Sequence, residues 1–273
     1  MKRILTAIVA LPILLYTVWS SIPYFFAALA AIAIVIAISE FYNLAAKVGC
    51  KTHDFAGYLA GLAISACFVF GKVEWIVAVV AALVIASLAL ALTKPDDIKN
   101  SLISVSATVF GVIYVGLLAG CLIGVRMVQD TPQSKNLAPK LLTMFFAMVM
   151  MTDTGAYYTG RSIGKNKLAP RISPGKTIEG FIGGFVAAIA AGPLCKFTFF
   201  YELNLIHSLM LGALIGLIGP VGDLAESMLK RGSDVKDSGT LLPGHGGMLD
   251  RVDSILFCAP LLYFYWRLFG SYL

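Results

Sequence analysis

Charged residues are scarce in this chain. Asp, Glu, Lys and Arg make up 13% of its 273 residues, whereas a soluble domain carries about 25%. No polar stretch is long enough to enclose a core of its own, while hydrophobic residues make up 59% of the chain. This composition excludes an ordinary soluble domain and predicts an all-α polytopic integral membrane protein.

Cysteine and acidic residues are also few. The cysteines are widely spaced and have neither metal-binding nor redox spacing, so we interpret them as small buried hydrophobic residues; they are Cys50, Cys67, Cys121, Cys195 and Cys258. Fifteen acidic residues face 21 Lys and Arg, which gives a net charge of +6. Because the basic residues sit in short loops between apolar runs, lipid headgroups or an anionic substrate are expected as partners, and no nucleic acid.

Apolar runs of the length of a membrane helix recur along the chain. They are continuous, without the alternation of a transmembrane β-strand, and therefore predict helices. We expect about nine spans, near Ile4–Trp19, Ile22–Tyr42, Asp54–Phe70, Val73–Thr93, Ser101–Val125, Pro139–Tyr158, Thr177–Phe200, Leu205–Leu229 and Val252–Phe269.

The basic residues predict the orientation of these spans. With the N-terminus in the cytoplasm, fifteen of the 21 Lys and Arg residues fall on the cytoplasmic side, as the positive-inside rule requires. This arrangement places the polar ends of the C-terminal helices in the cytoplasm. We expect a multi-pass protein of the cell membrane, such as a bacterial inner membrane, with its active site facing the cytoplasm.

The two halves of the chain differ in chemistry. We predict a single membrane domain in which residues 1–138 are mainly scaffold and residues 139–273 carry the catalytic helices and loops. The first five spans are bland, with small residues suited to close packing in lipid. Glu40 lies at the cytoplasmic end of the second span, and we interpret it as an interfacial residue near Lys47.

A first polar cluster occupies residues 152–180. Asp153 lies within an apolar run, where an ionisable residue is costly and usually functional. The following loop offers cations and glycines before an expected helix N-terminus, which suits an anion such as phosphate; its candidate ligands are Arg161, Lys165, Lys167, Ser173, Lys176 and Thr177. The loop lacks the GxxxxGK[ST] spacing, and we expect no strand before it, which excludes a P-loop. An ordinary positive-inside loop is the simpler alternative.

The second cluster, residues 223–253, holds six of the fifteen acidic residues. Asp223, Glu226, Ser227 and Lys230 have the i, i+3, i+4, i+7 spacing that places residues on one helix face. Asp250 and Asp253 share a face in the same way at the start of the last span. Carboxylates beside basic residues suit Mg²⁺ with a bound nucleotide. The structural alternative is local ion pairing. In that case Glu226 pairs with Lys230, and Asp250 pairs with Arg251 or Lys236.

Glycines surround a histidine between these two acid pairs, in the run LLPGHGGMLDR. Pro243, Gly244, Gly246 and Gly247 favour a tight turn whose N–H groups can approach a phosphate. His245 is a candidate phosphate ligand or acid/base, or it caps the turn.

These residues resemble the signature of the phosphatidate cytidylyltransferase family. The matching residues are Ser227, Lys230, Arg231, Lys236, Asp237, Gly239, Leu242, Pro243, His245, Gly246, Gly247, Met248, Asp250, Arg251, Val252 and Asp253, and residues 153–180 resemble the family's second characteristic segment. The resemblance implies the reaction of CTP with phosphatidate to give CDP-diacylglycerol and pyrophosphate, in phospholipid biosynthesis. It also implies a divalent cation, usually Mg²⁺, and a homodimer.

With this reaction, each candidate residue receives an expected role. The expected catalytic residues are Asp223, Lys230, Arg231, Lys236, Asp237, His245, Asp250 and Arg251. The expected substrate ligands are the six loop residues above together with Ser227, Gly246 and Gly247, and the expected metal ligands are Asp223 and Asp250, then Asp253 and Glu226. Two alternatives stay open: a related CTP-dependent lipid enzyme, such as an archaeol-type cytidylyltransferase or a polyprenol kinase, and an anion transporter.

Overall fold

The computed structural model describes residues 2–93, 98–239 and 246–270, and the side chains from residue 8 onward except that of residue 9. The chain forms two compact units. Unit 1 comprises Met1–Met127 and Leu229–Val252, and unit 2 comprises Val128–Met228 and Asp253–Leu273. Leu229–Val252 thus groups with the N-terminal helices. The functional division at residue 138 stays a prediction.

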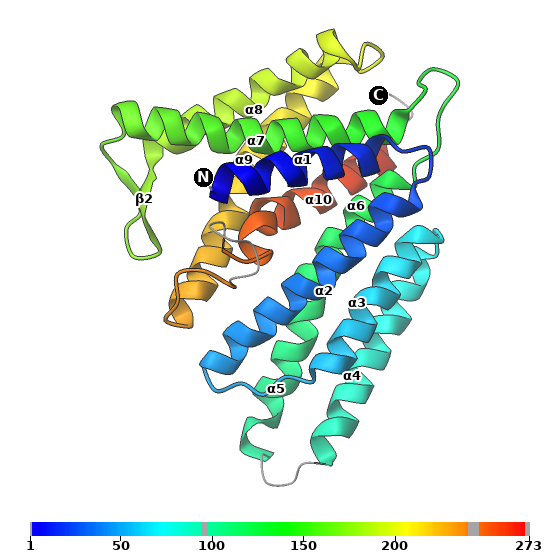
Figure 1. Cartoon of the computed structure of the whole chain (residues 1–273), viewed down its shortest axis with the longest axis vertical. Helices are drawn as coiled ribbons and strands as arrows, with labels where there is room; N and C mark the ends of the chain where they lie inside the picture. The colour runs from blue at the N-terminus through cyan, green and yellow to red at the C-terminus, as the bar shows by residue number, and fades with distance from the viewer. Residues whose placement is uncertain (1, 94–97, 240–245, 271–273) are drawn as a thin grey trace. The chain divides into compact units, whose positions relative to one another are not determined.

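All nine predicted apolar segments are helical in the described residues, which confirms the all-α class (Figure 1). The helices are α1 (Lys2–Trp19), α2 (Tyr24–Lys47), α3 (Asp54–Val69), α4 (Ile76–Leu92, preceded by the 3-10 turn η1, Val73–Trp75), α5 (Ile98–Gly111), α6 (Leu118–Arg126), α7 (Leu137–Ile163), α8 (Ile178–Thr198), α9 (Leu205–Gly232) and α10 (Leu249–Phe269). A π-helical segment, η3 (Val112–Leu117), joins α5 to α6, so these two form one of the predicted spans.

Six segments within the described ranges are long and apolar enough to cross a membrane. They are Tyr24–Lys47, Val73–Leu92, Ile98–Arg126, Ile178–Thr198, Leu205–Gly232 and Leu249–Phe269. The apolar parts of α1 and α3 are shorter, and α7 carries Lys140, Asp153 and Arg161 along its length. The chain is therefore a multi-pass membrane protein, and the number nine stays a prediction.

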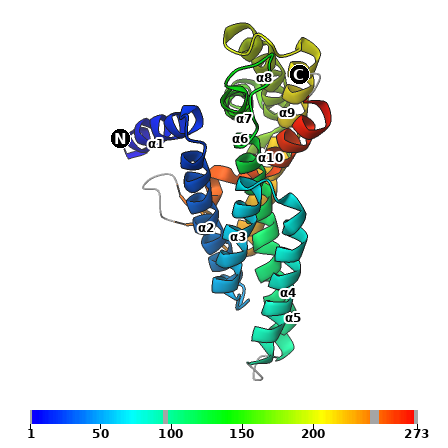
Figure 2. The same cartoon turned by 90° about the vertical axis from the view of Figure 1, so that its right-hand side faces the viewer.

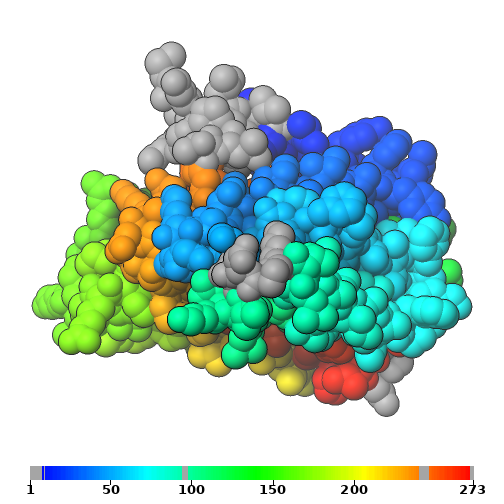
Figure 3. Space-filling model, turned by 90° about the horizontal axis from the view of Figure 1, so that it is seen from below, coloured from blue at the N-terminus to red at the C-terminus, as the bar shows by residue number. Residues whose placement is uncertain are grey.

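Unit 1 is built around α2 and α3, which run alongside α5 and α6 (Figures 1 and 2). Small residues permit this packing, as predicted: a Cβ at Gly57 would collide with Tyr42, and one at Gly61 with Ile38. The Tyr42 hydroxyl donates to the Thr108 carbonyl at 2.8 Å. Figure 3 shows the blue residues near position 50 beside the blue-green start of α5. Near the other end of α5, Thr108 Oγ1 accepts a hydrogen bond from the His53 N–H at 2.9 Å.

Unit 2 is organised by the close pairing of α7 with α8 (Figure 1). A Cβ at Gly155 would lie 2.9 Å from the Gly183 carbonyl, and one at Gly184 would lie 2.6 Å from the Thr152 carbonyl. A Cβ at Gly212 of α9 would likewise lie 2.5 Å from the Ala188 carbonyl of α8. Backbones this close are typical of helix packing in lipid, where small residues form the interfaces.

A short antiparallel hairpin connects α7 to α8. Its strands are β1 (Lys167–Ala169) and β2 (Ser173–Thr177), with Lys167 opposite Thr177 and Ala169 opposite Ser173. The expectation that no strand precedes SPGKT was wrong, because β1 precedes it and SPGKT itself forms β2. The backbone pairing fixes Lys176 and Thr177 at the start of α8 instead of leaving them on an open loop.

Candidate active site

Unit 2 contains a pocket of about 520 Å³ at the hairpin end of α7 and α8. Four predicted site residues line this pocket, and Asp153 lines it as well. A functional position for Asp153 was expected because an acid within an apolar run is costly. The charged and polar lining residues are Asp153, Tyr157, Arg161, Lys176, Thr177 and Asp223, and the apolar lining includes Leu168, Phe181 and Pro220. Lys165, Lys167 and Ser173 of the same basic segment are not among the lining residues.

Thr177 and Glu179 shape the edge of this pocket at the start of α8. Thr177 is the N-cap residue, and its Oγ1 accepts a hydrogen bond from the Gly180 N–H at 3.1 Å. The Glu179 carboxylate accepts from the backbone N–H groups of Lys165 at 3.1 Å and Asn166 at 3.2 Å. The predicted role of Thr177 as a substrate ligand therefore competes with a structural role that its hydroxyl already performs.

Replacing Thr177 with Ala should destabilise the protein by about 1 kcal/mol, since the first turn of α8 loses its cap. Thr177→Ser retains the hydroxyl and is the matched control. Thermal unfolding in detergent measures the difference. Equal midpoints for the Ala variant and the parent chain would show that the cap contributes nothing.

Lys176 and Asp223 form an ion pair within the pocket. The Lys176 Nζ lies 2.6 Å from Asp223 Oδ2, and the two side chains are 24% and 32% exposed. Arg161 of α7 lines the same pocket, and its Nη1 donates a hydrogen bond to the Tyr157 hydroxyl at 2.9 Å. The pocket thus holds two cations, one of them beside a carboxylate.

Three carboxylates lie near each other in unit 2. Asp253 interacts electrostatically with Asp223, Asp153 and Lys176. The approach of α10 to α9 is close here, because a Cβ at Gly222 would lie 2.6 Å from the Asp253 carbonyl. A bound cation would reduce the electrostatic repulsion between these carboxylates.

The donor set of these carboxylates fits a divalent cation of the Mg²⁺ type. Within residues 2–93, 98–239 and 246–270, no group of three or more His, Cys, Asp or Glu side chains is arranged to hold a metal ion. Mg²⁺ usually takes one or two carboxylates and completes its coordination with water and substrate phosphates. Asp223 and Asp253 match that pattern, and Glu226 is a fully buried residue of the same helix as Asp223.

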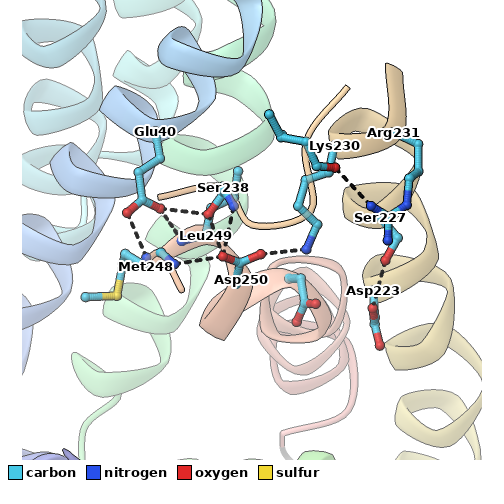
Figure 4. A network of polar contacts seen from close by, with 12 residues as sticks. Glu40, Asp223, Ser227, Lys230, Arg231, Ser238, Met248, Leu249 and Asp250 are labelled. Carbon is cyan, nitrogen blue, oxygen red and sulfur yellow. Dashed lines mark hydrogen bonds and ion pairs between the residues drawn. The ribbon is translucent and has the colours of Figure 1, made fainter. Parts of the chain in front are cut away.

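Unit 1 holds a second polar network, centred on Asp250 (Figure 4). Its Oδ1 accepts from Lys230 Nζ at 2.5 Å. Its Oδ2 accepts from the Ser238 N–H at 2.9 Å, the Ser238 hydroxyl at 3.0 Å and the Gly247 N–H at 2.7 Å. The structural alternative from the sequence, a pairing of Asp250 with Arg251 or Lys236, is not what the structure has. Lys230 from α9 is its partner, and the carboxylate holds the segment before α10 in place.

Glu40 belongs to this network, although the sequence analysis set it aside. It is 7% exposed, and its carboxylate accepts hydrogen bonds from the N–H groups of Met248 and Leu249 at 2.9 and 2.8 Å. The interpretation of Glu40 as an interfacial residue near Lys47 was therefore wrong. Its isolation as the one acid in an apolar helix was the signal that could have identified it. Ser238 was also missed.

The remaining predicted residues have looser surroundings. Arg231 donates from Nη1 to the Val235 carbonyl at 3.0 Å, and Ser227 donates to Asp223 Oδ1 at 3.4 Å. Gly246 has a φ of 78°, the left-handed conformation that glycine supplies without strain. Lys236, Asp237 and Arg251 are exposed. His245 lies outside the described residues, so its predicted role is untested.

Comparison with known proteins places this arrangement in a family. The profile of the Cytidylyltransferase family matches residues 1–269, nearly the whole chain. The chain belongs to the cytidylyltransferase family. Its membership confirms the resemblance predicted from residues 223–253.

Individual relatives agree over shorter ranges. A Bacillus subtilis phosphatidate cytidylyltransferase is 45% identical over 161 residues, which cover 58% of this chain and 56% of that protein. A Staphylococcus haemolyticus phosphatidate cytidylyltransferase is 50% identical over 117 residues, or 43% and 45% of the two chains. An uncharacterized Escherichia coli protein, YnbB, is 44% identical over 132 residues, or 46% and 43%. The matched regions span about half the length of these relatives.

Proposed function

We propose that this protein is a phosphatidate cytidylyltransferase. The proposed reaction joins CTP and phosphatidate to form CDP-diacylglycerol and pyrophosphate. The observation that carries the proposal is the unit 2 pocket, which combines Arg161 and Lys176 with Asp153 and Asp223 beside apolar residues. Such a pocket suits phosphate groups attached to a lipid or a nucleotide. The names of the Bacillus and Staphylococcus relatives support the choice of phosphatidate as substrate.

The proposed chemistry is a direct nucleotidyl transfer. A phosphate oxygen of phosphatidate attacks the α-phosphorus of CTP and forms a new P–O–P linkage. The bond between the α-phosphorus and its bridging oxygen to the β-phosphate breaks, and pyrophosphate leaves with the electron pair. The nucleophile is already an anion, so no strong general base is required, and positioning and charge neutralisation carry the catalysis.

In this proposal Arg161 and Lys176 bind phosphate oxygens and offset the negative charge that develops on them. Asp223 orients Lys176 through the 2.6 Å ion pair. Lys230, Arg231, Lys236 and Arg251 keep their predicted roles as phosphate-binding cations. Lys165, just before the hairpin, and Lys167 and Ser173, on its strands, are proposed as outer ligands that first meet the nucleotide.

Mg²⁺ is the proposed cofactor, held by Asp223 and Asp253. When bound, it neutralises phosphate charge and activates the α-phosphorus. From the sequence, Asp250 and Asp223 were the first candidates for metal ligands. Its four hydrogen bonds to Lys230, Ser238 and Gly247 instead favour a role in holding the segment before α10. The N-terminus and the pocket are proposed to face the cytoplasm, where CTP is available, in the cell membrane. A homodimer is proposed as well.

An assay of the purified protein in detergent tests the function. Phosphatidate, CTP and Mg²⁺ should give CDP-diacylglycerol and pyrophosphate in equal amounts, and a chelator should stop the reaction. Diacylglycerol and a polyprenol, each offered in place of phosphatidate, are the controls for a lipid kinase. A phosphorylated lipid and CDP from either control, with no product from phosphatidate, would replace this proposal by the kinase alternative.

A further inference from the structure

Glu40 is a buried carboxylate that the proposed chemistry does not use. It lies near the end of α2, far in sequence from its partners: the bonds to Ser238, Met248 and Leu249 join residues 198, 208 and 209 positions apart. Both carboxylate oxygens are engaged. Oε1 accepts from the Met248 N–H, and Oε2 accepts from the Leu249 N–H and, at 3.1 Å, from the Ser238 hydroxyl (Figure 4).

The segment on either side of residues 240–245 fits tightly around this carboxylate. A Cβ at Gly239 would lie 2.5 Å from Glu40 Oε1, and one at Gly247 would lie 2.4 Å from Oε2. Real Cβ contacts are never this short. The two glycines are therefore needed because the Glu40 carboxylate occupies the space that a side chain would fill. Both glycines are among the residues that resemble the family signature, and in this chain they make room for Glu40.

Glu40 and Asp250 accept hydrogen bonds from neighbouring donors at the start of α10. The Gly247 N–H donates to Asp250, and the next two N–H groups, of Met248 and Leu249, donate to Glu40. The Ser238 hydroxyl lies within hydrogen-bonding distance of both carboxylates. Because α10 begins at Leu249, these are the N–H groups at a helix start, which lack partners within the helix. A carboxylate there is also favoured by the helix dipole.

We infer that Glu40 is a positioning residue for the transferase reaction, an inference that rests on the function proposed above. Glu40 fixes the start of α10 and the residues on both sides of the predicted phosphate-binding turn, and it touches no reacting atom. Fixing them sets the direction in which Asp250 and Arg251 leave the helix start. Removing an outer partner that orients a metal ligand typically costs about 10- to 100-fold in activity. We expect loss of Glu40, which orients the proposed phosphate ligand Arg251, to lower kcat by about the same factor.

The test compares three variants. Glu40→Gln keeps the size of the side chain but turns one acceptor oxygen into a donor facing other donors, and Glu40→Ala removes both acceptors. Glu74→Gln makes the same chemical change at an exposed acid of η1 and is the matched control. At saturating CTP, well below the unfolding temperature, kcat should fall about 10- to 100-fold in the two Glu40 variants. The KM for CTP should change little, and Glu74→Gln should match the parent chain.

Amide hydrogen exchange supplies a readout that does not depend on activity. Peptides covering residues 246–250 should lose protection in Glu40→Gln, whereas peptides from α7 and α8 should not change. If the parent chain makes no CDP-diacylglycerol, the proposed function fails, and the exchange data still decide whether Glu40 anchors this segment.

The kinetic and exchange results together decide the inference. Lost protection with a lowered kcat in the folded variant supports it. Unchanged protection would show that Glu40 is not the anchor. Lost protection with an unchanged kcat, or an activity loss that only follows the fraction of unfolded protein, would reduce Glu40 to a purely structural residue and overturn the inference.

Discussion

Asp223→Asn should lower turnover by about 10²- to 10³-fold, the loss typical when one preorganised electrostatic group is removed. The Asp223 carboxylate lines the pocket, lies 2.6 Å from Lys176 Nζ and interacts electrostatically with Asp253. Asn has nearly the same size but no charge, so it neither binds a divalent cation well nor orients Lys176 as strongly. Formation of CDP-diacylglycerol across a series of Mg²⁺ concentrations measures the effect.

Asp234→Asn is the matched control for this substitution. Asp234 is an exposed acid that follows α9, and its φ of 54° lies in the left-handed region, which Asn adopts readily. This variant should retain normal turnover. Near-normal activity of Asp223→Asn, in a protein that unfolds at the same temperature as the parent chain, would contradict the assignment of Asp223.

Asp250→Ala should reduce the free energy of unfolding by about 3–5 kcal/mol, because it breaks a buried ion pair from one side. The Asp250 side chain is 5% exposed, and that of its partner Lys230 is 12% exposed. The substitution leaves the Lys230 ammonium without this carboxylate and also removes the acceptor for the Ser238 and Gly247 donors. Chemical denaturation in detergent measures the loss.

Lys230→Met provides the comparison for Asp250→Ala. Asp250 keeps its hydrogen bonds from Ser238 and Gly247 in this variant, so the destabilisation should be smaller, about 1–3 kcal/mol. The order of the two losses is the informative result. If Lys230→Met destabilised the protein as much as Asp250→Ala, the ion pair alone would matter, and the backbone bonds to Asp250 would contribute little.

The helical architecture could be predicted from the sequence because the apolar runs are long and continuous. Every predicted run forms a helix in the described residues, with ends shifted by a few positions. The hairpin of β1 and β2 was missed because its strands have three and five residues and carry two lysines and a proline. Such short strands are stabilised by their pairing and leave no pattern of alternation.

The candidate site was predicted in part. Arg161, Lys176, Thr177 and Asp223 do line one pocket, because the basic segment and the acidic helix both stood out against an apolar background. The network of Asp250 could not be predicted, since its partner Lys230 and its link to Glu40 depend on contacts between distant segments. Local spacing favoured neighbours such as Arg251 instead.

The role of the glycines also depends on contacts between segments that the sequence does not reveal. The loop glycines Gly160, Gly164 and Gly175 were interpreted as sources of flexible backbone N–H groups for a phosphate. In the structure, a Cβ at Gly164 would lie 2.7 Å from Thr177 Oγ1, and one at Gly180 would lie 2.8 Å from the Ala156 carbonyl. These glycines let α7 approach the start of α8. Gly175 has open space around it and is the position that best keeps the predicted contact with substrate.

Tracing the phosphates of CTP tests the central claim most directly. Purified protein receives phosphatidate and Mg²⁺ with CTP labelled at the α-phosphorus, and in a parallel reaction with CTP labelled at the γ-phosphorus. Nucleotidyl transfer predicts that the α-label enters the lipid product and that the γ-label appears only in pyrophosphate. Entry of the γ-label into lipid, with the α-label remaining in CDP, would contradict the account and identify the enzyme as a CTP-dependent kinase.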